Sequence, residues 1–201
     1  MGLFHNRTVT EEQQTRVPVW FMRQAGRYHT HYQNIRQNSD FMTMCKTPEL
    51  AEEITHGPIQ DFDFDAAILF SDLLFPLEQL GMGLNYHSGP PKLAFHLETT
   101  GDLEKLEVKT PAREFYHFQK QACERLSASL PASKSLLGFA GAPFTLYTYA
   151  VEGSHKGNLV QAKKGLVTGL FNGFWEKLFP ELLEELCVQA EGGAEAVCLF
   201  D

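Results

Sequence analysis

Four short and almost continuously apolar runs divide the sequence, at residues 17–22, 66–70, 136–140 and 196–200. None of them alternates between apolar and polar positions, which is typical of strands that are buried on both faces of a parallel sheet. Longer segments with apolar residues at helical spacing separate the runs. The pattern therefore predicts buried strands that alternate with helices.

The helical segments begin with recognisable start signals. Thr47, Pro48 and Glu49 offer a capping hydroxyl, a proline for the first turn and an acid near the positive end of the helix dipole. A second helix is predicted from Thr110 onward, and a third over about residues 172–191. These segments supply the helices that an alternating fold requires.

Alternation of strands and helices indicates an α/β fold. A doubly wound sheet and a (β/α) barrel both fit the pattern. No glycine-rich phosphate loop follows any of the runs, so a nucleotide-binding doubly wound sheet is the weaker choice. We expect a polar N-terminal segment at residues 1–16, α/β structure over residues 17–201, and an inserted hairpin within residues 84–95.

The composition, 43% hydrophobic and 21% charged, suits a soluble protein with one sizeable core. No apolar run is long enough to span a membrane, and residues 1–16 lack the apolar core of a signal peptide, so we expect a cytosolic protein without membrane contact. The net charge of −8 argues against nucleic acid as a partner. Free thiols in a reducing compartment are expected for the four cysteines, which form no CxxC pair: Cys45, Cys123, Cys187 and Cys198.

Charge is distributed unevenly along the chain. The first 36 residues hold five arginines, two glutamates and no lysine, for a formal charge of +3. A guanidinium grips a carboxylate or phosphate with two parallel hydrogen bonds, whereas an ammonium is a point charge. A cluster made only of arginine therefore indicates recognition of an anionic ligand. The composition leaves open the alternative of a solvated basic terminus.

Residues suited to a binding site follow each apolar run, and ligands of α/β folds bind at the carboxyl ends of strands. Arg23 and Arg27 follow the first run and Asp72 the second, Tyr149 comes after the third, and Asp201 follows the fourth. The set contains no Ser-His-Asp triad, no metal-ligand cluster and no lysine placed for a Schiff base. Arginines with a carboxylate and a phenol suit the binding of carboxylates and the stabilisation of a cation. Each residue has an alternative role. The two arginines could form internal ion pairs, Asp72 could cap the turn after its strand, and Tyr149 could serve in packing.

Residues 18–28, with the sequence PVWFMRQAGRY, resemble the signature near the N-terminus of the uroporphyrinogen decarboxylases. Further similarity to that family, in the same order, occurs at residues 45–51, 65–74, 138–145 and 149–153. The resemblance covers residues 17–201, which is nearly the whole chain.

The resemblance implies a TIM (β/α)8 barrel, of which residues 17–201 would form the N-terminal half, about the first four βα units. It implies a carboxy-lyase that converts uroporphyrinogen III to coproporphyrinogen III, by decarboxylating four acetate side chains in heme biosynthesis. It also implies a tetrapyrrole as the partner, a homodimer, and neither a metal nor an organic cofactor.

The resemblance assigns roles by position. Asp72 matches the aspartate at the centre of the family's site, and Tyr149 matches a tyrosine that contacts the substrate. With Arg23 they are the expected catalytic residues: Asp72 would stabilise a cationic ring, and the arginines would position carboxylates. The residues that match the substrate-binding loop are Arg23, Gln24, Ala25, Gly26 and Arg27.

The sequence departs from the family at His29 and His31, which we expect on the surface, and at His56 and Gly57. A complete barrel needs roughly 250 residues. We therefore expect either a fragment of a longer protein or a chain that pairs with another. Two further functions remain open: a non-catalytic porphyrinogen-binding fragment, and a related cobalamin-linked methyltransferase of the same fold.

Overall fold

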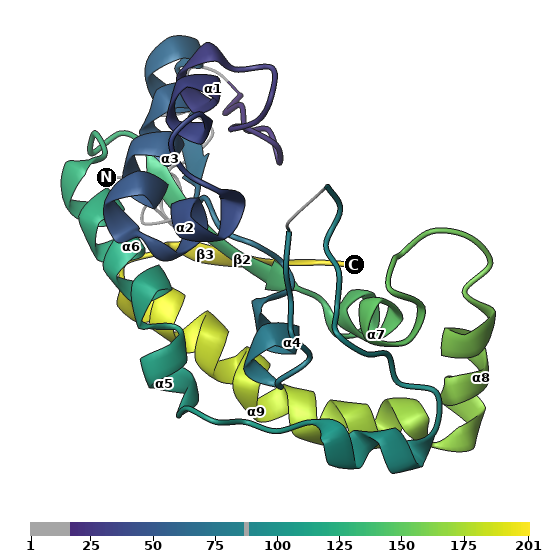
Figure 1. Cartoon of the computed structure of the whole chain (residues 1–201). Helices are drawn as coiled ribbons and strands as arrows, with labels where there is room; N and C mark the ends of the chain where they lie inside the picture. The colour runs from purple at the N-terminus through teal and green to yellow at the C-terminus, as the bar shows by residue number, and fades with distance from the viewer. Residues whose placement is uncertain (1–16, 87–88) are drawn as a thin grey trace. The chain divides into compact units, whose positions relative to one another are not determined.

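The computed structural model describes residues 17–86 and 89–201 (Figure 1), so the N-terminal segment expected at residues 1–16 lies outside the described residues. The strands are β1 (Ala66–Ile68), β2 (Ser135–Gly141) and β3 (Ala196–Phe200). The helices are α1 (Thr30–Arg36), α2 (Phe41–Lys46), α3 (Pro48–Phe62), α4 (Phe75–Gln79), the 3-10 helix η2 (Thr100–Lys105), α5 (Ala112–Phe115), α6 (His117–Ser129), α7 (Pro143–Glu152), α8 (Val160–Thr168) and α9 (Leu170–Glu191).

The chain divides into two compact units. The first unit contains the described residues up to 71 together with residues 117–139 and 188–198. The second unit contains residues 72–116, 140–187 and 199–201. The arginines that follow the first apolar run belong to the first unit, whereas the aspartate after β1 and the tyrosine on α7 belong to the second.

The strands form a sheet in the order β1-β2-β3. β1 pairs with β2 in parallel, with Ala66 opposite Ser135 and Ile68 opposite Leu137. Every residue of these two strands is buried, as continuous apolar runs require. The predicted α/β fold with buried parallel strands is therefore confirmed.

The regular strand that the first apolar run predicts, over residues 17–22, does not form. This segment is attached to the chain before β1 by two hydrogen bonds: the N–H of Asp65 donates to the carbonyl of Val19 at 2.9 Å, and the N–H of Val19 donates to the Asp65 carboxylate at 2.6 Å. Pro18 contributes no N–H, and the carboxylate takes the donor that a strand ladder would use. The prediction of a strand here is wrong.

The predicted helix starts are met in part. α3 begins at Pro48, but the side chain of Thr47 makes no capping hydrogen bond. The helix predicted from Thr110 is divided, because α5 ends at Phe115, with Tyr116 as its C-cap, and α6 begins at His117. The hairpin expected within residues 84–95 is reduced to an isolated antiparallel bridge among the described residues.

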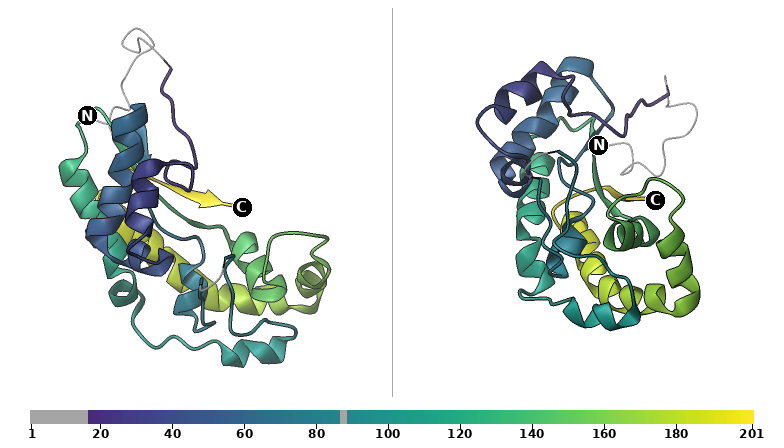
Figure 2. Two further views of the ribbon diagram at one scale, coloured as in Figure 1. Left: turned by 45° about the horizontal axis from the view of Figure 1, so that its top comes forward. Right: turned by 45° about the vertical axis from the view of Figure 1, so that its right-hand side comes forward.

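Helix packing supplies the apolar interior of each unit. In the first unit α3 packs against α6, and in the second α7 packs against α8 (Figure 2). The ring of Tyr147 on α7 lies 5.6 Å from that of Phe174 on α9, and a Cβ added to Gly165 on α8 would lie 1.7 Å from the Tyr147 hydroxyl. The core cluster of the first unit includes Ala51, Leu69, Ala122, Cys123, Leu126 and Leu136.

A glycine in β2 gives α9 access to the backbone of that strand. The side-chain amide of Gln189 accepts a hydrogen bond from the N–H of Phe139 at 2.7 Å and donates one to its carbonyl at 2.9 Å. A Cβ on Gly138 would lie 2.3 Å from the Gln189 Oε1 atom. The glycine therefore keeps a buried backbone N–H and C=O paired.

We expect Gly138→Ala to destabilise the chain by about 1–3 kcal/mol, since the added methyl group would displace Gln189 and leave backbone groups unpaired. Denaturant unfolding followed by circular dichroism measures the change. Gly101→Ala is the matched control, because its Cβ would have its nearest neighbour at 3.5 Å and should leave the midpoint unchanged. Equal midpoints for Gly138→Ala and the wild type would contradict the packing argument.

Candidate functional site

The loop that follows the first apolar run is fastened to β1 by one side chain. Gln24 is only 3% exposed. Its Nε2 atom donates to the carbonyl of Ala66 at 2.6 Å, and its Oε1 atom accepts from the N–H of Ile68 at 3.2 Å. A primary amide suits both partners because one end donates and the other accepts. Gln24 thus occupies the place of a neighbouring strand along β1.

Further contacts shape the same loop. The N–H of His29 donates to the carbonyl of Gly26 at 3.0 Å, and the hydroxyl of Tyr28 donates to the carbonyl of Gln24. Ala25 packs against a core cluster of the first unit. The backbone of the loop is therefore fixed by its own hydrogen bonds and by the core beneath it.

Arg23 and Arg27 project from this fixed loop with exposed side chains, and Arg36 is exposed in the last turn of α1. Within residues 17–86 and 89–201, no acidic side chain forms an ion pair with Arg23 or Arg27. The carbonyl of Arg27 accepts a hydrogen bond from the side chain of Gln33. In the described part of the chain, both guanidinium groups are thus available to an external anion.

An aromatic hollow of about 290 Å³ lies beside Arg23 in the first unit. Its other lining residues are Phe21, Tyr28, Phe62 and Phe64. The rings of Phe21 and Phe64 have centroids 5.2 Å apart, and those of Phe62 and Phe64 are 5.5 Å apart. A guanidinium beside aromatic rings suits a flat apolar group that carries a carboxylate.

His29 and His31 pack over α3 rather than both lying on the surface. His29 is 5% exposed, so the expectation of a surface position is wrong for it. Its Nε2 atom lies 2.7 Å from a carboxylate oxygen of Asp61, which provides a buried imidazole with a partner. A Cβ on Gly57 would lie 2.5 Å from His31 and 3.0 Å from His29. The helix glycine, which weakens a helix by about 1 kcal/mol relative to alanine, therefore makes room for the two rings.

Asp72 lies in the second unit, beyond the carboxyl end of β1, and is 8% exposed. Its Oδ2 atom accepts a hydrogen bond from the hydroxyl of Tyr86, and its Oδ1 atom accepts one from the N–H of Leu74 at 3.4 Å. Burial raises the pKa of Asp72 to about 6, while the hydrogen bonds from Tyr86 and the backbone oppose that rise. The carboxylate is therefore mainly ionised at neutral pH.

Tyr149 and Asp201 both contact other groups of the second unit. The hydroxyl of Tyr149, on α7, lies 2.7 Å from Nδ1 of His155. The carboxylate of Asp201 accepts hydrogen bonds from the N–H of Thr145 at 3.0 Å and from its hydroxyl at 3.2 Å. The N-cap position of α7 is Ala142, which has no capping side chain, so Asp201 serves as the cap.

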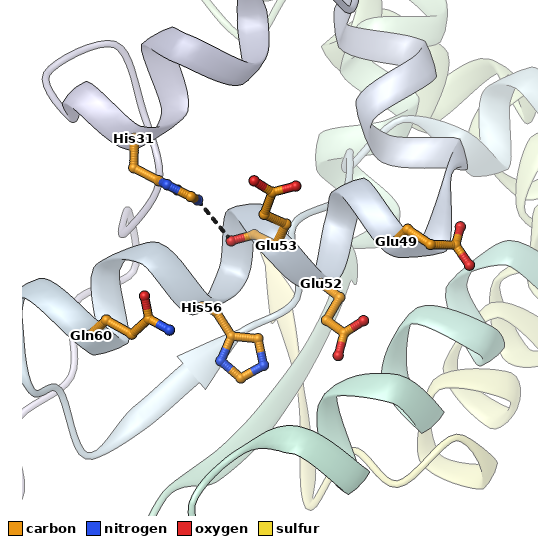
Figure 3. Close-up of a pocket in the computed structure, with 6 residues that line it drawn as sticks. All are labelled: His31, Glu49, Glu52, Glu53, His56 and Gln60. Atoms are coloured by element: carbon orange, nitrogen blue, oxygen red, sulfur yellow. Dashed lines mark hydrogen bonds between the residues drawn. The ribbon is translucent and has the colours of Figure 1, made fainter.

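A second hollow, of about 280 Å³, lies on α1 and α3 of the first unit (Figure 3). His31 comes from α1 and its Nε2 atom lies 3.0 Å from the carbonyl of Glu53, as the dashed line shows. On α3, His56 is hydrogen-bonded to Ser129, and Glu52 pairs with Arg125 at 2.6 Å. Three of the lining side chains thus already have protein partners, so this hollow is the weaker candidate for the site.

No group of three or more histidine, cysteine, aspartate or glutamate side chains among the described residues could hold a metal ion. The cysteines are free, and burial raises the pKa of the Cys123 thiol to about 12, which makes it unreactive. No described helix is long and apolar enough to span a membrane.

Comparison with known proteins identifies the class. A family model described as uroporphyrinogen decarboxylase (URO-D) matches residues 5–201. The uroporphyrinogen decarboxylase of Syntrophotalea carbinolica is 40% identical over 189 residues, which are 93% of this chain and 54% of that protein. The uroporphyrinogen decarboxylase of a Roseiflexus species is 41% identical over 187 residues, which are 92% of this chain and 53% of that protein.

A solved methyltransferase from Methanosarcina mazei superposes with a TM-score of 0.56 at 16% identity, covering 77% of this chain and 45% of that one. At this identity the likeness supports the fold alone, and the fold is that of the TIM-barrel enzymes. The chain belongs to the uroporphyrinogen decarboxylase family. It spans about half the length of the curated relatives that it matches.

Two features of these surroundings were not predicted from the sequence. Tyr86 is 14 positions from Asp72, and no motif connects them. The pairing of His29 with Asp61 was also missed, although an unexpected histidine pair and an unexpected helix glycine were both visible in the sequence. The helix glycine was the available signal, because a glycine inside a helix can leave space for a neighbouring ring.

The raised pKa of Asp72 makes its ionised form unfavourable in the folded state. The protonated carboxyl group therefore stabilises the fold. This stabilisation is fully present below the unfolded pKa, near 4, and is lost as pH rises through the folded pKa of about 6. Asp72→Asn keeps an acceptor for Tyr86 but cannot ionise, so we expect it to stabilise the chain at pH 7 by up to about 3 kcal/mol. Urea unfolding at pH 4 and pH 7 measures this effect. The advantage should vanish at pH 4, and an equal advantage at both values would disprove the assignment.

Proposed function

We propose that this chain contributes the anion-binding loop and the central carboxylate of a uroporphyrinogen decarboxylase, which converts uroporphyrinogen III to coproporphyrinogen III. The single observation that carries the proposal is the environment of Asp72: a buried carboxylate with neutral donors, in a chain that belongs to this family. Residues 17–201 would be the N-terminal half of the barrel. A homodimer and a cytosolic location are further parts of the proposal, as the family resemblance implies.

Each decarboxylation needs a place for the electron pair of the broken bond. Protonation of the pyrrole carbon next to the one that bears the acetate makes the ring cationic. The bond between the acetate methylene and its carboxylate then breaks, CO2 leaves, and the electron pair enters the ring. Protonation of the resulting exocyclic methylene and loss of the ring proton complete a methyl group, with a net uptake of one proton.

Asp72 is suited to stabilise the cationic ring in this sequence. Its carboxylate retains acceptor sites beyond those used by Tyr86 and Leu74, and pyrrole N–H groups are matching donors. A fixed negative charge in a buried place acts most strongly on charge that develops in the transition state. With a pKa of about 6, Asp72 carries that charge at neutral pH.

Arg23 and Arg27 are suited to hold the carboxylates of the substrate. Their guanidinium groups are exposed on a loop whose backbone is fixed, and a fixed loop loses little freedom on binding. Gln24, Ala25 and Gly26 support this loop and bring backbone groups near a bound anion. Tyr149 offers a hydroxyl that can bind a further carboxylate.

The proposal is tested by anaerobic incubation of uroporphyrinogen with this chain, followed by chromatography of products that carry seven to four carboxylates. Asp72→Asn should reduce product formation by about 10²–10³-fold, the usual effect of removing one preorganised charge-stabilising group. Full activity in Asp72→Asn would rule out the role given to the carboxylate. Absence of product from the wild type would mean that this chain does not carry the activity by itself.

Arg23→Ala should weaken binding of uroporphyrinogen by at least about tenfold, because a charge-assisted hydrogen bond contributes about 1.5–3 kcal/mol. Arg23→Lys should restore only part of the loss, since an ammonium lacks the bidentate fork. Anaerobic equilibrium binding measures both variants. Arg113→Ala is the matched control, as its guanidinium pairs with Glu184 at 2.8 Å and lies outside the loop. An equal loss of binding in Arg113→Ala would show that binding depends only on the overall charge of the chain and not on Arg23.

A further inference from the structure

The second unit contains a phenol that is bonded to the proposed central carboxylate. We propose that Tyr86 is a positioning residue, which holds the side chain of Asp72 in one orientation and in its ionised form. The role of Asp72 itself rests on the proposed function. The contact between the two side chains does not rest on it, and can be tested separately.

The geometry gives Tyr86 one of the two carboxylate oxygens. Its hydroxyl donates to Oδ2 of Asp72, while Oδ1 accepts from the N–H of Leu74 at 3.4 Å. The N–H of Leu73 is a further donor to the same carboxylate. A carboxylate has about four acceptor sites, so these three donors hold it from two segments of the chain and still leave a site for a substrate N–H group.

The backbone around Tyr86 is itself held in place. Asn85 and Lys92 exchange two hydrogen bonds, each 2.9 Å long, in an antiparallel bridge. Nearby, the N–H of Ala94 donates to the carbonyl of Met82 at 2.8 Å. Tyr86 therefore follows a residue that is fixed by backbone pairing, and this pairing sets the position from which its hydroxyl contacts Asp72.

The charges near Asp72 explain why a donor is needed there. Burial is the main influence that raises the pKa of this carboxyl group, and the charge of Glu78 raises it further. The hydrogen bond from Tyr86 is the strongest influence in the opposite direction, followed by the N–H groups of Leu74 and Leu73. The carboxylate is thus kept ionised chiefly by a neutral phenol.

The test is a 13C NMR titration of the chain labelled at the aspartate carboxyl carbons, with Asp72→Asn to identify the resonance. Tyr86→Phe removes only the hydroxyl. This substitution should raise the pKa of Asp72 from about 6 by about one unit or more, which means that the carboxylate binds its proton at least about tenfold more tightly. The acid limb of uroporphyrinogen turnover should move by the same amount. Tyr147→Phe is the matched control, because no described group is hydrogen-bonded to its hydroxyl.

The outcomes separate this inference from the proposed function. An unchanged titration of Asp72 in Tyr86→Phe overturns it, as does an equal shift in Tyr147→Phe. A shifted titration with an unmoved acid limb supports the hold of Tyr86 on Asp72 and instead contradicts the role that the proposed function gives to the ionised Asp72. If the wild-type chain yields no product, the proposed function fails for this chain, and the titration alone decides whether Tyr86 holds Asp72 ionised. Unfolding curves of both variants confirm that each is folded.

Discussion

Burial of β1 along its whole length means that its backbone groups need partners on both sides. On one side β2 supplies them in parallel register. On the other side no regular strand from the described residues pairs with β1, and the side chain of Gln24 bonds to the backbone of Ala66 and Ile68. The position of the loop that carries Arg23 and Arg27 is therefore set by the hydrogen bonds that the backbone of β1 requires.

Asp72 shows a different balance in the second unit. Burial alone would favour its neutral form, whereas the proposed chemistry needs the charge. The donors that oppose protonation, a phenol and backbone N–H groups, are uncharged. A cation in their place would have held the carboxylate ionised but would also have cancelled its field. Neutral donors leave the full negative charge available to a cationic substrate.

Much of this arrangement could be predicted from the sequence, because buried parallel strands are continuously apolar and their carboxyl ends collect polar residues. That logic located the sheet and Asp72. It failed at residues 17–22, where pairing depends on a proline and on a carboxylate 46 positions away. It also missed the contacts of Tyr86 and His29, since each is made with a residue distant in sequence. Periodicity reports which face of an element is buried, but not which side chains meet across it.

The structural role of Gln24 means that its presence in a related sequence is weak evidence that the related protein is active. Asparagine is one methylene too short for this contact, glutamate at neutral pH has no donor for the Ala66 carbonyl, and lysine has no acceptor for the Ile68 amide. Selection for folding alone would therefore retain the glutamine in a descendant that no longer turned over any substrate. A search for degenerate copies of such an enzyme would do better to score the exposed arginines, which the sheet does not require.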